Sequence, residues 1–308
     1  MSYQTELRQQ ITEKIVAAIR AGTPPWRRPW GTGSGCSVAT NITTRKRYRG
    51  INPLLLQIAA QEYGFVSNWW GTFRQWQTVG GWVQKRPDSV APGAWGTKVV
   101  FYCPIERVIE NEDGEEEEEK FFVLRQFTVF NLDQVDGEAL DHLRQQPATN
   151  GSPIVDYKPA EEAIQATQAD IRYGGDQAFY DRLGDYIQMP PKETFSQAHE
   201  WYGTHFHELV HWSECRLNWK GCYALGELIA EIGSCYLANE LAIPQSDDLR
   251  NHNAYLAHWL KALEDDHNAI FRASNQASKA ADFILSFSRK PEEKTSAGAK
   301  GGVAVGAA

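Results

Sequence analysis

The run THFHELVHWSECR, residues 204–216, places three of the chain's eight histidines within seven positions. From His207 to His211 it reads H-E-x-x-H. Residues four apart on a helix project from one face, so both imidazoles can reach the same tetrahedral ion. Glu208 follows the first of these histidines, where it can hold and deprotonate an attacking water instead of binding the ion. The run therefore predicts a helix that carries a catalytic metal site.

The neighbours of this motif help to separate the metal interpretation from a plainer one. His205 lies two residues before His207, roughly 200° around the helix, so it cannot share the site. The flanks WYGTHF and LVHW are apolar and aromatic, which predicts that one side of the helix is buried. Buried histidine and glutamate are costly without partners. A hydrogen-bonded core cluster would also satisfy them, but the spacing favours a metal.

The next helical stretch supplies candidates for the third protein ligand that such a site needs. Within ELIAE, residues 227–231, Glu227 and Glu231 again lie four apart on one face. The pair resembles the E-x-x-A-[DE] arrangement of glutamate-ligated zincins, in which the first acid binds metal and the second supports a ligand histidine. By that analogy Glu227 is the ligand, and the reverse assignment stays open. Zinc suits this ligand set, with manganese or another divalent ion as alternatives.

Three protein ligands leave one position open, so the predicted site is catalytic in form. The expected reaction is zinc-dependent peptide hydrolysis, in which Glu208 takes a proton from water and passes it to the leaving amine. The sequence DYIQMP, residues 185–190, is expected to be the edge strand that pairs with an extended substrate. A fourth protein ligand would instead indicate a structural metal.

The first third of the chain differs from the rest in charge. Residues 1–108 carry 14 Lys and Arg against 5 Asp and Glu, although the whole chain has a net charge of -8. Basic side chains interleaved with aromatic ones are typical of a surface for single-stranded DNA, because cations neutralise phosphates and rings stack on bases. The alternative is that the tryptophans are core and the arginines a solvated face. The predicted DNA contacts are Arg27, Arg28, Arg45, Lys46, Arg47, Tyr48, Arg49, Trp69, Trp70, Arg74, Trp76 and Lys85.

Hydrophobic periodicity and turn residues predict an α+β fold in two domains. A DNA-binding domain containing a β-hairpin is expected over residues 1–145 and a mostly helical domain over 153–290. The Gly- and Ala-rich segment 291–308 is predicted to be a disordered tail. The expected elements are helices at 3–21, 158–170, 195–213, 222–241 and 250–286, helices capped by Asn52 and Thr72, and a hairpin at 97–132 whose acidic run, residues 109–119, extends into solvent.

Composition argues against several classes of protein. The cysteines are odd in number and contain no CxxC pair, which argues against a disulfide framework and a four-thiolate zinc site; they are Cys36, Cys103, Cys215, Cys222 and Cys235. The N-terminus lacks the apolar core of a signal peptide, and no apolar run reaches the roughly 20 residues that span a bilayer. The expected location is therefore the cytoplasm, without a membrane partner.

Several motifs follow one another along the chain, namely YRGINPLLL, TFRQWQTVGGWVQK, VVFY, FTVFNLDQV, AFYDRLGDYIQMP, YGTHFHELVHW and ELIAEIGSCYLA. Their order resembles ArdC-type antirestriction proteins of conjugative plasmids, over about residues 5–285. The resemblance implies a single-stranded-DNA-binding domain joined to a zincin-like metallopeptidase domain. It also implies that His207 and His211 are metal ligands, Glu208 the general base, and Glu227 and Glu231 the acidic pair.

Two functions from different classes follow from these expectations. In the first, the protein binds single-stranded DNA without sequence specificity and protects incoming plasmid DNA from host restriction during conjugation, with the zincin domain as an accessory. In the second, it is a DNA-tethered metalloprotease whose main activity is cleavage of a DNA-bound protein, such as a restriction enzyme subunit. The first rests on the basic, aromatic N-terminal part, and the second on the complete H-E-x-x-H motif with its acidic partners.

Overall fold

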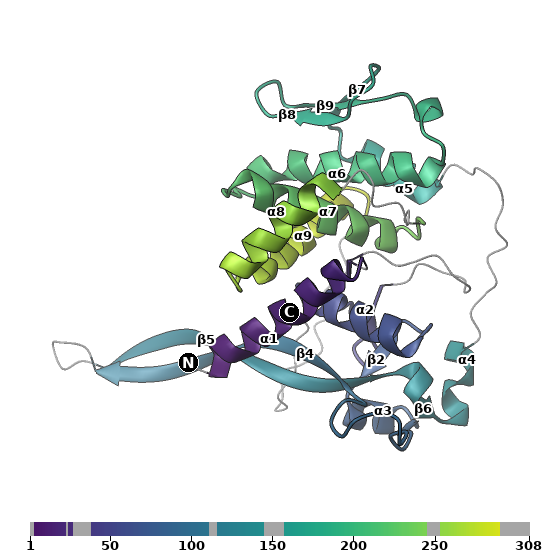
Figure 1. Cartoon of the computed structure of the whole chain (residues 1–308), viewed down its shortest axis with the longest axis vertical. Coiled ribbons are helices and arrows are strands. Elements are labelled where there is room, and N and C mark those ends of the chain that lie inside the picture. The colour runs from purple at the N-terminus through teal and green to yellow at the C-terminus, as the bar shows by residue number, and fades with distance from the viewer. Residues whose placement is uncertain are drawn as a thin grey trace.

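A computed structural model of the chain describes residues 3–22, 24–26, 38–110, 116–144, 157–244 and 253–289. Figure 1 shows a half built around a long twisted hairpin and a half built mostly from helices, with helix α1 between them. The predicted α+β class is therefore confirmed. The tail 291–308 and the linker around residues 145–153 lie mainly outside the described residues, so the division into two domains stays a prediction.

The hairpin half contains two small sheets and the helices that cover them. One sheet has the strand order β1-β2-β5-β4, with β1 parallel to β2 and the other pairs antiparallel, and the second pairs β3 with β6. The elements are α1 (Tyr3–Arg20), β1 (Thr40–Asn41), α2 (Asn52–Tyr63), β2 (Trp69–Gly71), α3 (Phe73–Thr78), β3 (Trp82–Val83), β4 (Thr97–Glu110), β5 (Glu116–Asn131), β6 (Val135–Asp136) and α4 (Asp141–Arg144).

The predicted hairpin is confirmed as the pair β4 and β5. Its register runs from Thr97 opposite Val129 to Glu110 opposite Glu116, and it projects from the molecule in Figure 1. The tip, residues 111–115, lies outside the described residues. The expectation that the acidic run extends into solvent therefore stays a prediction.

One of the two predicted helix caps is confirmed and the other is wrong. The Thr72 side chain accepts from the backbone N–H of Gln75, and the Gln75 side chain accepts from the backbone N–H of Thr72, which is a capping box. Asn52 is instead the first residue of α2. Its side chain forms two 2.8 Å hydrogen bonds with the backbone of Val100 in β4. Asn52 thus joins α2 to β4. The preference of asparagine for the N-cap position is a local signal and does not predict such a long-range contact.

The helical half consists of a three-stranded sheet and five helices among the described residues. The sheet order is β7-β9-β8, with β7 parallel and β8 antiparallel to β9. The predicted helix over 250–286 is two helices, because the Asp266 carboxylate accepts from the Asn268 backbone and pairs with Arg272, which starts a new helix. The elements are α5 (Lys158–Ala166), β7 (Asp170–Tyr173), β8 (Phe179–Asp181), β9 (Tyr186–Met189), α6 (Ala198–Arg216), α7 (Tyr223–Glu240), α8 (Asn253–Asp265) and α9 (Ala269–Ser286).

Close packing of α6 on α7 positions the residues of the H-E-x-x-H motif. A Cβ at Gly233 of α7 would lie 2.8 Å from Val210 Cγ2, closer than real Cβ contacts allow. Glycine at this position therefore lets the two helix backbones approach each other. Val210 is fully buried between His207 and His211, so the same approach brings α7 against the histidine face of α6.

One hydrophobic core continues from the helical half into α1 and α2. The Thr12 hydroxyl donates to the His267 carbonyl (2.8 Å), and Arg20 pairs with Glu264 of α8. The Tyr236 hydroxyl of α7 donates to the Gly50 carbonyl (2.9 Å), so the halves also meet beside α2. The described cysteines are free thiols, and none of the described helices is both long enough and apolar enough to cross a membrane.

Candidate metal centre and nucleic-acid surface

Helices α6 and α7 bring together the side chains of His207, His211 and Glu227. The two histidine Nε2 atoms lie 3.2 Å apart, and the Glu227 carboxylate oxygens lie 3.5 Å from His207 Nε2 and 3.6 Å from His211 Nε2. With metal–ligand bonds of about 2.0–2.1 Å, neighbouring ligand atoms of a tetrahedral site are separated by roughly 3.3–3.4 Å. The observed separations fit this value, so the donor set and its geometry suit one zinc-sized divalent ion.

Glu208 lies beside these ligands but is not part of their cluster. It is 7% exposed and hydrogen-bonded to the backbone of Tyr180 in β8. Burial raises the pKa of the Glu208 carboxyl, and the two neighbouring histidines oppose this rise. A buried carboxylate of raised pKa is a better proton acceptor than an exposed one, which suits a general base.

Carboxylates dominate the electrostatics around the two histidines. Burial alone lowers the pKa of His207, but the hydrogen bond to Glu227 and the other nearby carboxylates outweigh burial and raise it. Burial would likewise raise the pKa of Glu227, but the hydrogen bond from His207 lowers it. The raised pKa of His207 shows that the surrounding carboxylates stabilise positive charge, as a divalent cation requires. The lowered pKa of Glu227 keeps its carboxylate ionised, the form that binds a cation.

The structure separates the two acids of ELIAE and adds a third that the sequence reasoning missed. Glu227 belongs to the cluster of possible ligands, whereas Glu231, 2% exposed, does not, although its charge acts on His207. Glu214 Oε1 lies 2.9 Å from His211 Nδ1. This contact fixes the ring so that Nε2 faces the ligand cluster. Its signal in the sequence was an acid three residues after His211 on the same helix.

His205 lies away from the site, as the helical spacing predicts. It is fully buried, and its ring packs edge-to-face against Trp201 and Tyr173. Neither ring nitrogen has a hydrogen-bond partner among the described residues. Burial lowers the pKa of His205 to about 3, so the ring is neutral at physiological pH.

The predicted edge strand is wrong in one respect. Residues 186–189 form β9, which is the central strand of its sheet, because β7 and β8 pair with its two sides. The strand beside the metal ligands is β8, whose residues Phe179 and Tyr180 line an open cleft of about 1070 Å³ together with His207, Glu208 and Glu227. The chain reverses between residues 181 and 186, and β9 then lies between β7 and β8. Spacing along the sequence does not reveal this order.

The basic turn, residues 43–49, presents part of the predicted DNA surface. The Asn41 side chain accepts from the backbone N–H groups of Thr43 and Thr44, which shapes the turn and leaves Arg45 and Lys46 exposed. The Arg45 guanidinium stacks over the Trp69 ring, 4.6 Å from its centroid. The turn therefore combines two cations with an aromatic ring, the pairing expected at a single-strand surface.

Further exposed side chains follow on α3 and β3. Asn41 Nδ2 donates to Gln75 Oε1 of α3 (3.1 Å), so α3 lies beside the basic turn. Arg74 and Lys85 are exposed. Among aromatic residues, Phe73 is 48% and Trp82 62% exposed. Phe73 was not predicted as a DNA contact, because phenylalanine side chains usually lie in the hydrophobic core.

Other predicted DNA contacts are corrected by burial. Tyr48, Trp70 and Trp76 are 7%, 2% and 0% exposed, so their ring faces cannot stack on a strand that lies on the surface. The Trp76 ring instead donates Nε1–H to the Phe130 carbonyl at 3.0 Å. For these three residues the core alternative holds, because packing on the sheet requires large rings.

The predicted arginine contacts divide into two groups. Arg47 and Arg49 form ion pairs with Glu240 and Asp282 of the helical half, instead of projecting freely into solvent. Arg27 and Arg28 lie outside the described residues. Of the predicted DNA surface, the exposed members that the structure describes are thus Arg45, Lys46, Arg74 and Lys85, with the partly exposed Trp69.

Comparison with known proteins gives the family. Residues 5–130 match the N-terminal domain of the anti-restriction factor ArdC, and residues 158–276 match a zincin-like metallopeptidase family. The fold matches the metal-free crystal structure of the antirestriction ArdC protein of plasmid R388, with a TM-score of 0.73 and 37% identity over 92% of this chain and 97% of that chain. The chain belongs to the ArdC antirestriction family. The resemblance noted in the sequence is confirmed.

Other relatives place this ArdC-family chain among plasmid and primase proteins. An Mn(II)-bound structure of the R388 ArdC protein matches with a TM-score of 0.71 and 37% identity, over 92% of this chain and 98% of that chain. Protein y4eC of Sinorhizobium fredii is 33% identical over 91% of this chain and 92% of that protein. DNA primase TraC of Escherichia coli is 34% identical over 92% of this chain but only 27% of the primase. The zincin-like domain of this ArdC-family chain implies a divalent metal.

Proposed function

We propose that the protein binds single-stranded DNA without sequence specificity in the cytoplasm and protects incoming plasmid DNA from host restriction during conjugation. We further propose that its helical half is a working metallopeptidase, zinc-dependent or served by another divalent ion such as manganese. The single observation that carries the enzymatic part is the triangle of ligand atoms from His207, His211 and Glu227 beside the buried Glu208. The antirestriction part is carried by membership of the ArdC family.

The geometry supports a specific division of labour in peptide hydrolysis. His207, His211 and Glu227 would hold the cation, which when bound polarises the scissile carbonyl. Glu208 orients the attacking water, takes its proton and passes it to the leaving amine. The Glu214 carboxylate keeps the His211 ring in place by its contact with His211 Nδ1. The backbone of β8 lies at the cleft, where an extended peptide could add to its outer edge.

The DNA-binding part is supported by the exposed cations of the basic turn and of α3. Arg45 and Lys46 would neutralise phosphates, while Trp69 and Trp82 offer rings to bases. Phosphate contacts and stacking on rings carry little sequence information, which fits binding without sequence preference. Single strands are favoured because stacking on a ring requires unpaired bases.

A second candidate function is favoured by the size of the cleft at the metal ligands. In this reading the protein is a DNA-tethered metalloprotease, and its main task is to cleave a protein met on the DNA, such as a restriction enzyme subunit. The cleft of about 1070 Å³ has room for a peptide segment and is open along β8. The two functions differ in whether protection of DNA needs the reaction.

Glu208→Gln distinguishes the two functions. We expect this variant to lose peptide hydrolysis by about 10²–10⁴-fold, because it lacks the general base, while metal uptake and oligo(dT) affinity stay unchanged. Protection of transferred plasmid DNA is then measured as the transconjugant yield in a restricting recipient relative to a non-restricting one. The matched control is Glu162→Gln, the same change at an exposed position of α5.

Each outcome of this comparison selects a function. Full protection by Glu208→Gln supports protection by binding, whereas loss of protection with intact DNA affinity supports the DNA-tethered protease. Failure of the unaltered protein to bind oligo(dT) at moderate salt would overturn the proposed DNA-binding role.

A further inference from the structure

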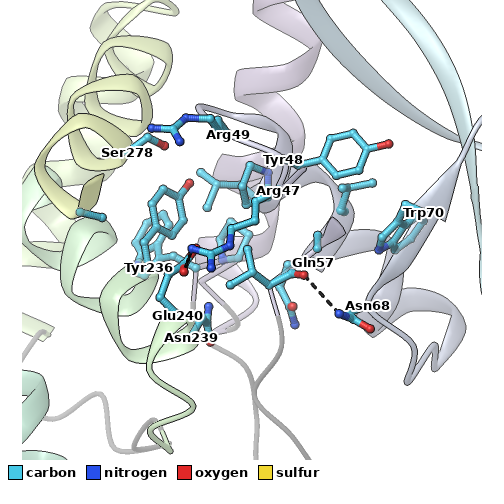
Figure 2. Close-up of a pocket in the computed structure, with 18 of the residues that line it drawn as sticks. Arg47, Tyr48, Arg49, Gln57, Asn68, Trp70, Tyr236, Asn239, Glu240 and Ser278 are labelled. Carbon is cyan, nitrogen blue, oxygen red and sulfur yellow. Dashed lines mark hydrogen bonds and ion pairs between the residues drawn. The ribbon is translucent and has the colours of Figure 1, made fainter. Parts of the chain in front are cut away.

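A second pocket lies between the two halves of the molecule, away from the metal ligands. Its walls come from the basic turn, α2 and β2 on one side and from α7 and α9 on the other (Figure 2). The cavity measures about 80 Å³, several times the roughly 10–15 Å³ that one water molecule needs. It therefore has room for a group larger than water.

Two arginines of the basic turn enter this pocket and pair with acids of the helical half. Arg47 pairs with Glu240 at the end of α7, and Arg49 pairs with Asp282 of α9. Figure 2 shows the Arg47 side chain lying across the pocket toward Glu240, with Arg49 near Ser278. Both arginine side chains remain 41% exposed, so an anion from solvent can reach them.

Glu240 has a second cationic partner, which makes its pair with Arg47 exchangeable. Arg289 Nη2 lies 2.8 Å from Glu240 Oε2. The Glu240 side chain is only 10% exposed, and a buried carboxylate left without a partner would be costly. Because Arg289 remains in place, Arg47 can leave Glu240 without creating such an unpaired charge.

The rest of the pocket combines apolar walls with neutral polar groups. Leu54, Leu56 and Trp70 supply apolar surface on the side of the hairpin half, and Ala281 and Leu285 supply it on the side of α9. The neutral polar groups of the lining include the amides of Gln57, Asn68 and Asn239. Apolar surface with a few hydrogen-bonding amides beside a guanidinium matches a nucleobase attached to a phosphate.

The proposed DNA surface and the pocket lining are neighbours along the chain. Arg45 and Lys46, both exposed, directly precede Arg47 in the basic turn. Consecutive phosphates of an extended strand lie several ångströms apart, as do the side chains of neighbouring turn residues. A strand held by Arg45 and Lys46 therefore has its next nucleotide at the mouth of the pocket.

We propose that this pocket binds one nucleotide of a single DNA strand, with its phosphate on Arg47 in place of Glu240 and its base between α2 and α7. This inference rests on the proposed DNA-binding function and assigns it a site at the junction of the two halves. Glu240 acts as an internal competitor, because its carboxylate occupies the position that the phosphate takes. Removing the charge of Glu240 should therefore strengthen DNA binding, whereas a purely structural ion pair predicts no gain.

The deciding experiment compares two substitutions that each neutralise one acid of an ion pair between the halves. Glu240→Gln removes the carboxylate that pairs with Arg47 in the pocket. Glu264→Gln changes the partner of Arg20 between α1 and α8, outside the pocket lining, and gives the same change in net charge. Fluorescence anisotropy of labelled oligo(dT) on the full chain measures both affinities. We expect Glu240→Gln to bind roughly three- to tenfold more tightly than Glu264→Gln.

Two further variants test the phosphate and base contacts separately. Arg47→Ala should weaken binding several-fold and reduce the magnitude of the salt slope by about 0.7, the value for one phosphate contact on a single strand. Gln57→Ala should weaken binding to oligo(dT) but not to an abasic oligonucleotide of equal length. Deoxythymidine monophosphate, added as competitor, shows whether the pocket takes a free nucleotide or requires the strand.

Equal affinities of Glu240→Gln and Glu264→Gln would overturn the inference, even if Arg47→Ala fails to fold. If the unaltered protein still binds oligo(dT) in that case, the proposed function stands and the pocket is only a contact between the halves. A Gln57→Ala loss that persists on the abasic strand would overturn the placement of the base. If the unaltered protein does not bind oligo(dT) at all, the proposed DNA binding and this inference fail together.

Discussion

At the metal centre, two long helices packed on each other hold two half-buried histidines and a buried glutamate whose possible ligand atoms lie together. In the basic turn, the charged side chains lie on a short loop. Some are exposed to solvent, and others form ion pairs with acidic residues of the helical half. His207, His211 and Glu227 contact one another, and a cation bound among them would use all three as ligands. Arg45 and Lys46 are stable in water without a ligand, whereas Arg47 and Arg49 are already paired.

This difference has a functional meaning. A site preformed by rigid helices can bind an ion and perform chemistry without rearrangement. A surface made of solvated or exchangeable cations binds a flexible polyanion, gains affinity from several weak contacts and is sensitive to salt. The three predictions below test this contrast.

The largest effect is expected at the metal ligands. Glu227→Ala removes one of the three proposed ligands, and we expect it to lower the affinity for Mn²⁺ or Zn²⁺ by more than about 100-fold. Glu231→Ala removes only a nearby charge, so its effect should stay within the roughly 10–100-fold typical of supporting residues. Isothermal titration with each metal measures both variants. A greater loss in Glu231→Ala would exchange the roles of the two acids.

A smaller effect should separate two tryptophans of the hairpin half. Trp76 is fully buried and Trp82 is 62% exposed. Trp76→Ala should cost about 3–5 kcal/mol of the free energy of unfolding. Trp82→Ala should leave stability nearly unchanged and weaken oligo(dT) binding by about 1–3 kcal/mol, the value of one base stacked on a ring. Chemical denaturation measures the free energy of unfolding, and fluorescence anisotropy measures the affinity for oligo(dT). An unchanged affinity of Trp82→Ala would show that β3 is not part of the DNA-binding surface.

The smallest effect concerns His205, the buried neighbour of the metal ligands. Burial lowers the pKa of His205 to about 3 from the ordinary histidine value of 6.5, so the unfolded chain binds a proton there that the folded chain does not. Stability is therefore lost as pH falls below 6.5, by roughly 2 kcal/mol at pH 5. His205→Phe should remove this share of the acid sensitivity. Thermal unfolding with a chelator at pH 7 and pH 5 measures it.

The exposed His142 provides the control for that experiment. His142→Gln should retain the full acid sensitivity of the unaltered chain. Equal pH dependence of His205→Phe and the unaltered protein would show that His205 is not kept neutral by burial.

Features that depend on local spacing could be predicted from the amino-acid sequence alone. His207 and His211 share a face because they lie one helical turn apart, and Glu208 must then lie next to them. The capping box at Thr72 and the β4–β5 hairpin are likewise local, since their partners are near in the chain. For such features backbone geometry leaves few alternatives.

Among chemically similar residues, long-range packing selects the ones that face inward, so their burial could not be predicted from the sequence. Composition could not distinguish Trp76 from Trp82, because burial depends on which sheet face each ring meets. It could not pair Arg47 with Glu240, since 192 intervening residues separate partners that the packing of the two halves brings together. The folded structure also places β9 between β7 and β8, because strand order depends on long-range pairing and not on position in the chain. Local geometry is encoded within a few residues, whereas burial, ion pairing and strand order depend on the whole folded chain.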